Sequence, residues 1–84
     1  QLQVYPKPLE KKILILFHST TGANAVVQLK SPEGKVLKSY TLKKLQQGNN
    51  SRTIKYKQLK RGNMLRFEFT EKDKTSVEQI LVVN

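Results

Sequence analysis

The sequence contains no cysteine and no tryptophan, and only three prolines, four glycines and one histidine occur among its 84 residues. Without cysteine there is no disulfide framework and no thiol chemistry, so packing must stabilise the fold. The longest apolar run, residues 13–17, is far shorter than the roughly 18 residues that span a bilayer as a helix. The chain begins with Gln1 and shows no signal peptide, and we expect it to be part of a longer protein.

Residues that carry out catalysis are also scarce. A catalytic zinc site usually needs three protein ligands, which the single His18 supplies poorly without cysteine. The six acidic residues fall mostly in turns or beside lysines, which suggests surface ion pairs rather than a matched acid and base. Glu71 and Asp73 resemble the start of a calcium loop, but its other ligands are missing. We therefore predict no enzyme activity, no metal site and no cofactor.

Positive charge is the feature in excess, since 16 lysines and arginines against six acidic residues give a formal net charge of +10. This charge favours anionic partners, but lysines along strands also prevent edge-to-edge pairing, so a solvated basic exterior is the simpler interpretation. Nucleic-acid binding is not expected, because at least four of the six aromatic residues alternate as core positions do rather than as stacking platforms. A local anion-binding patch stays open at Arg52, Lys55, Lys57, Lys60, Arg61 and Arg66.

Turn signals divide the chain into short segments in which apolar and polar residues alternate, as in β-strands that face a core. The expected strands are residues 2–5, 12–18, 25–30, 36–42, 53–57, 63–70 and 75–83. No segment keeps the 3.6-residue period of an amphipathic helix. We predict a single domain over residues 1–84, an all-β, Ig-like antiparallel β-sandwich of about seven strands.

Several residues have specific expected places in this sandwich. Pro6 should end the first strand, because proline has no N–H to donate to a ladder. Val36 should share a face of its strand with Tyr40 because the two positions have the same parity. Leu59 should close one end of the core, and residues 48–50 are predicted to form a loop.

The order of short motifs along the chain resembles that of a known family. The motifs are Val4-Tyr5-Pro6-Lys7-Pro8, the hairpin Ser31-Pro32-Glu33-Gly34-Lys35-Val36, Gly48-Asn49-Asn50 before Ile54, and Leu59-x-x-Gly62 before a strand, followed by a charged turn and a last strand. From Val4 to Val83 this succession resembles the type A C-terminal sorting domain of the Bacteroidota type IX secretion system. Lys7 stands where that family usually has asparagine, and Met64 where it usually has tyrosine.

The resemblance implies a non-catalytic export signal that lies at the C-terminus of a cargo protein. Its implied partners are the translocon, an outer-membrane shuttle and a surface sortase, and its implied route leads through the periplasm to the cell surface, outer membrane or exterior. Recognition is expected where edge backbone can dock a partner. The expected residues are Gly48, Asn49, Gly62, Val77, Glu78, Gln79, Ile80, Leu81, Val82 and Val83. A purely structural role for these residues, as core strand and turn glycines, is equally open.

Two other functions are compatible with the sequence. An Ig- or fibronectin-like accessory module of an exported protein, such as a linker or carbohydrate-binding domain, would show the same strand pattern. It would not need to end its parent protein, which a sorting domain must do. A basic nucleic-acid-binding domain is less favoured and predicts an affinity that falls steeply with salt.

Overall fold

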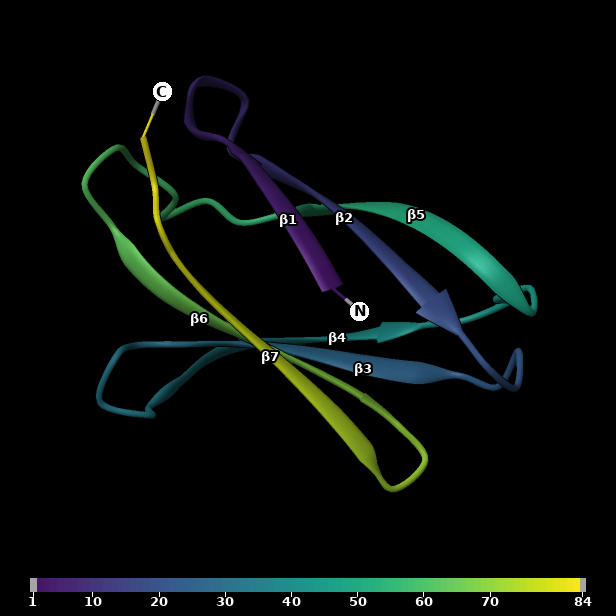
Figure 1. Cartoon of the computed structure of the whole chain (residues 1–84). Helices are drawn as coiled ribbons and strands as arrows, with labels where there is room; N and C mark the ends of the chain where they lie inside the picture. The colour runs from purple at the N-terminus through teal and green to yellow at the C-terminus, as the bar shows by residue number, and fades with distance from the viewer. Residues whose placement is uncertain (1, 84) are drawn as a thin grey trace.

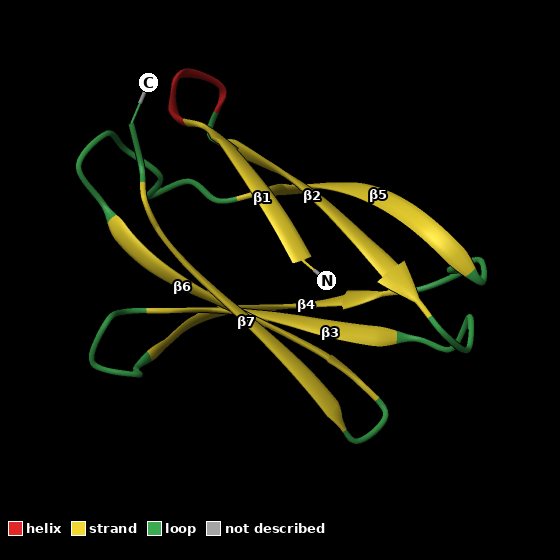
Figure 2. Cartoon of the chain, viewed as in Figure 1, coloured by secondary structure: helices red, strands yellow, loops and turns green. Residues whose placement is uncertain are grey.

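The computed structural model describes residues 2–83, which form seven strands and one three-residue 3-10 turn. Two antiparallel sheets face one another (Figure 1), one of three strands in the order β1-β2-β5 and one of four in the order β4-β3-β6-β7. Loops connect most successive strands, and the 3-10 turn connects the first two strands of the three-stranded sheet (Figure 2). The bounds are β1 Leu2–Lys7, η1 Pro8–Glu10, β2 Lys12–Ser19, β3 Ala25–Lys30, β4 Val36–Leu42, β5 Gly48–Lys55, β6 Met64–Glu71 and β7 Lys74–Leu81. The predicted all-β, Ig-like sandwich is confirmed.

Alternating side chains from both sheets meet in the core. In β2, Ile13 and Ile15 have no exposed surface, and Phe67 of β6 is equally buried in the opposite sheet. Phe17 of β2 and Phe69 of β6 join the two layers, with ring centroids 4.7 Å apart and planes inclined by 41°. Four aromatic side chains are buried, as the alternation predicted: Phe17, Tyr56, Phe67 and Phe69.

Leu59 closes one end of the core and has no exposed surface, as predicted. It lies in the connection between β5 and β6. The Lys11 ammonium donates a hydrogen bond to the Leu59 carbonyl, and the Tyr56 N–H donates to the Lys11 carbonyl at 3.0 Å. The β5–β6 connection is therefore bound to the β1–β2 turn that contains η1.

Among the strand boundaries that differ from the sequence-based prediction, the end of β1 and the start of β5 are explained by pairing. β1 continues through Pro6, which pairs with Ile13, because β1 is an edge strand and the missing N–H of a proline can face away from the ladder. Residues 48–50 are not a loop but the start of β5, where Gly48 pairs with Ser19. Glycine and asparagine favour turns locally, and here the pairing with β2 overrides that preference.

The pairing of β3 with β4 contains an irregularity that turns one side chain around. Leu29 pairs with Lys38 whereas Lys30 pairs with Val36, so Leu37 is an extra residue and forms a bulge. Val36 therefore faces away from the core and is 47% exposed. The prediction that Val36 shares a face with Tyr40 is wrong for this reason.

Candidate recognition surface

The strand β7 lies at the edge of the four-stranded sheet and pairs only with β6 among the described strands. Residues of an antiparallel strand alternate between bonding to the neighbour and facing away from it. The Val82 N–H donates to the Asn63 carbonyl at 2.7 Å, which sets this alternation for the whole strand. The backbone N–H and C=O groups of Val77, Gln79 and Leu81 therefore face the open edge.

The outer face of β7 carries apolar side chains beside these open backbone groups. Val77 is 48% exposed and Leu81 is 54% exposed. Met64 of β6 lies directly opposite Leu81 and is also exposed. The edge thus combines unpaired backbone with apolar surface, while Gln79 supplies a polar, exposed side chain between the two aliphatic ones.

Glu78 and Ile80 lie on the other face of β7 and point toward the core. They pair with Phe67 and Leu65 of β6, and both are half-buried. An inward-pointing charge on an edge strand hinders indiscriminate pairing with other edges. Glu78 is therefore only partly accessible to a partner, whereas Gln79 on the opposite face is exposed.

The last described residues extend the strand beyond its regular part. β7 ends at Leu81 rather than at Val83, but Val82 is fully buried and its carbonyl accepts a hydrogen bond from the Gly62 N–H at 2.8 Å. Val83 is 61% exposed. Gly62 has a φ of +94°, which an L side chain rarely adopts, so its backbone conformation alone explains a glycine at this position.

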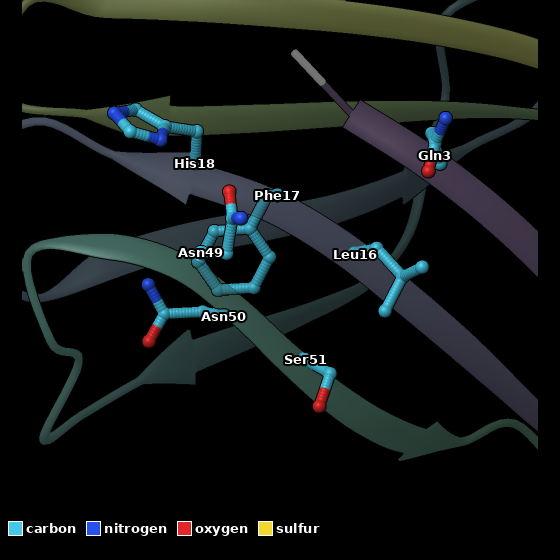
Figure 3. Close-up of a pocket in the computed structure, with 7 residues that line it drawn as sticks. All are labelled: Gln3, Leu16, Phe17, His18, Asn49, Asn50 and Ser51. Carbon is cyan, nitrogen blue, oxygen red and sulfur yellow. The ribbon is translucent and has the colours of Figure 1, made fainter.

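Gly48 and Asn49 lie in the other sheet, at the start of β5. Asn49 is exposed opposite His18, and both residues line a shallow depression on the outer face of the three-stranded sheet (Figure 3). Gly48 has a φ of +106°. Because Gly48 and Asn49 belong to one sheet and β7 to the other, the predicted recognition residues do not form one continuous site.

Asn50, the next residue, fastens the turn that precedes β5. Its side-chain oxygen accepts a hydrogen bond from the Gln46 N–H at 3.0 Å, and its amide donates to the carbonyls of Gln46 and Gly48 at 2.8 and 3.0 Å. The side chain is buried. The Asn50 side chain therefore has a structural role in the turn that precedes β5.

Glu71 has a structural role that sequence reasoning missed. Its buried carboxylate accepts hydrogen bonds from the hydroxyls of Ser19 and Thr21 and from the Thr20 N–H. The Ser19 hydrogen bond is the main reason that the pKa of Glu71 lies below its ordinary value, although burial acts in the opposite direction. Glu71 therefore anchors the β2–β3 turn instead of forming a surface ion pair, and no local motif signals a contact between residues so distant in sequence.

The predicted basic patch is only partly assembled. Arg66 lies 3.1 Å from the Glu68 carboxylate, which also pairs with Lys30 at 3.1 Å. The Arg52 guanidinium donates to three backbone carbonyls at 2.8 to 3.2 Å. Arg52 and Arg66 are therefore engaged in these contacts. The other members of the predicted patch lie at the end of β5 and in the connection between β5 and β6: Lys55, Lys57, Lys60 and Arg61.

Among residues 2–83, no group of three or more histidine, cysteine or acidic residues is placed to hold a metal ion. That part of the chain also contains no helix with the length and apolar character required to cross a membrane. The family model described as the secretion system C-terminal sorting domain matches residues 3–83. No curated protein and no solved structure matches the chain.

Proposed function

The chain belongs to the family of type IX secretion C-terminal sorting domains, and we propose that it is the non-catalytic signal that directs one cargo protein through this system. Family membership implies export to the cell surface or exterior and contact with the secretion machinery. We further propose that the cargo crosses the periplasm on the way. In this proposal the translocon, the outer-membrane shuttle and the surface sortase each bind the folded domain.

The observation that best supports such binding is the open edge of β7. A strand supplied by a partner could pair with the N–H and C=O groups of Val77, Gln79 and Leu81. When a partner adds a strand to a sheet edge in this way, the main-chain hydrogen bonds give affinity, and alternate side chains give specificity. The exposed side chains of Val77 and Leu81 would fit apolar pockets on the partner.

The other three edges of the sandwich are less suited to strand addition. β1 contains Pro6, which removes a donor, and β4 contains the bulge at Leu37. In β5 the Arg52 side chain bonds to the backbone carbonyls of Lys43 and Lys44. β7 has no proline and an unbroken register with β6 over all eight pairs, so we assign recognition to β7 and to the exposed Val83 that follows it.

A pair of substitutions at one position tests the backbone contribution. Gln79→Pro removes an N–H that faces the open edge, and proline is tolerated on an edge strand when its nitrogen lies on the free side. Gln79→Ala keeps that N–H and removes only the side chain. Each variant is fused to a reporter in a type IX-competent host, and the exported fraction of the reporter is measured.

We expect the proline variant to be exported poorly and the alanine variant to be exported normally, with both melting cooperatively. The melting temperature of each purified domain serves as the control for folding. Normal export of the folded proline variant would remove the β7 edge from the recognition surface. Glu78→Pro, which deletes a ladder hydrogen bond, shows how an unfolded domain behaves in the same assay.

A further inference from the structure

We propose that the end of the sandwich around η1 docks onto the headgroup region of an anionic lipid bilayer. The docking surface consists of the exposed Leu9 at the tip of η1 and of the lysines in residues 7–12 and 55–60. It lies at the end of the domain where the β1–β2 turn meets the β5–β6 connection (Figure 1), and it does not involve the outer face of β7. Substitutions in this surface can therefore be tested separately from those on the outer face of β7.

Leu9 is the most exposed large apolar side chain among the described residues, with 95% of its surface accessible. It is held out on a fixed turn, because Pro8 beneath it is buried and the Lys11 N–H donates to the Pro8 carbonyl at 3.2 Å. A single exposed leucine is ordinary on a protein surface. Leu9 is a candidate membrane contact because basic residues surround it.

A row of three lysines crosses the three-stranded sheet at the base of this turn. Lys7 of β1 is directly opposite Lys12 of β2, and Lys12 is directly opposite Lys55 of β5. Neighbouring strands are about 4.8 Å apart, so three like charges stand side by side, an arrangement that destabilises a sheet. Among the described residues, none of the three lysines has an acidic partner within ion-pair distance.

More positive charge gathers around the row. The β5–β6 connection adds Lys57, Lys60 and Arg61, and a shallow hollow lined by Leu9, Lys11, Lys60 and Arg61 joins this connection to η1. Glu10 is the only acidic residue in the segments 7–12 and 55–61, against seven basic ones. The outer face of the four-stranded sheet differs, because Glu68 there balances Lys30 and Arg66.

A bilayer fits this surface better than a soluble anion does, because an apolar side chain protrudes between the cations. Leu9 would enter the acyl boundary while the lysines contact lipid phosphates. Tyr5 lies in the next cross-strand row on the same face and is 46% exposed, and tyrosine is a side chain suited to a membrane interface. Leu14, opposite Tyr5, is half-buried and continues the apolar surface.

The test is sedimentation of the 84-residue chain with vesicles of phosphatidylcholine mixed with phosphatidylglycerol, and with vesicles of phosphatidylcholine alone. We expect binding to the anionic vesicles only, weakened by salt. The triple variant K7Q/K12Q/K55Q should bind about a hundredfold more weakly, about fivefold for each lysine. Leu9→Ser should weaken binding about tenfold, and because Leu9 is exposed this change should leave the fold intact.

The matched control is K43Q/K72Q/K74Q, which removes the same charge from exposed lysines outside the η1 surface. It should lower binding far less than the η1 triple variant. Equal losses in the two triple variants, or unchanged binding by Leu9→Ser, would overturn the proposal. Binding to an oligonucleotide or to polyglutamate without binding to anionic vesicles would assign the surface to a soluble anion instead.

Discussion

Substitution of Glu71 by glutamine tests whether this buried carboxylate anchors the β2–β3 turn. The carboxylate receives hydrogen bonds from the Ser19 hydroxyl, from the Thr21 hydroxyl at 2.8 Å and from the Thr20 N–H at 3.4 Å. Glutamine has nearly the same shape but no charge, and its amide nitrogen cannot accept a hydrogen bond. The change therefore weakens the hydrogen bonds without emptying the space.

The expected loss follows from the two hydroxyl bonds, both of which end on the same carboxylate oxygen. Hydrogen bonds to a charged group contribute about 1 kcal/mol more than neutral ones, so the two together lose about 2 kcal/mol. The glutamine amide would also face the Thr20 N–H, donor against donor. For a chain of this length, about 2 kcal/mol corresponds to a melting temperature lower by about 10 °C at neutral pH.

The difference between the two proteins must also depend on pH. The pKa of Glu71 is lowered in the folded state, so the carboxylate stabilises the fold at neutral pH, and this stabilisation is lost as the pH falls through the folded-state pKa. That window lies below the ordinary glutamate pKa of about 4.3. Urea unfolding followed by circular dichroism from neutral to acidic pH measures the difference, because all other carboxylates titrate alike in both proteins. A difference that is absent at neutral pH, or that persists unchanged in acid, would refute the role given to Glu71.

Two further substitutions test the fold around the proposed surfaces. Leu59→Ala should destabilise the domain by about 3 kcal/mol, because it leaves a cavity where the fully buried Leu59 closes the core, and denaturant unfolding measures this loss. Gly48→Ala should lower the free energy of unfolding by about 2 kcal/mol, because a residue with a side chain rarely adopts the φ of +106° found at Gly48. Export of the folded variant should be unchanged. Lost export without lost stability would show that Gly48 belongs to the recognition surface.

Much of the sandwich could be predicted because alternation is a local signal. Ile13 and Ile15 recur every second residue and are buried, and Leu59 stands as a lone apolar residue in a polar connection and closes the core. What failed depends on partners distant in sequence. The pairing of Gly48 with Ser19 and the bulge at Leu37 are set by neighbouring strands, and nothing in their local sequence specifies them.

The candidate surfaces likewise combine features that the local sequence predicts with features that only the pairing of strands reveals. Sequence reasoning placed recognition on the last strand, but the separation of inward Glu78 from outward Gln79 required the register with β6. The lysine row is invisible along the chain, because Lys7, Lys12 and Lys55 come from three strands and meet only through pairing. Net charge predicted a basic exterior, whereas the topology decides where that charge is concentrated.

Export of a reporter by this chain tests the central claim most directly. Residues 1–84 are fused to the C-terminus of a reporter that otherwise stays in the periplasm, and the fusion is produced in a type IX-competent strain and in a matched strain without the translocon. The reporter should reach the cell surface or medium in the first strain and stay in the periplasm in the second. Retention in the periplasm of both strains, or release from both, would contradict the assignment of this domain as a sorting signal.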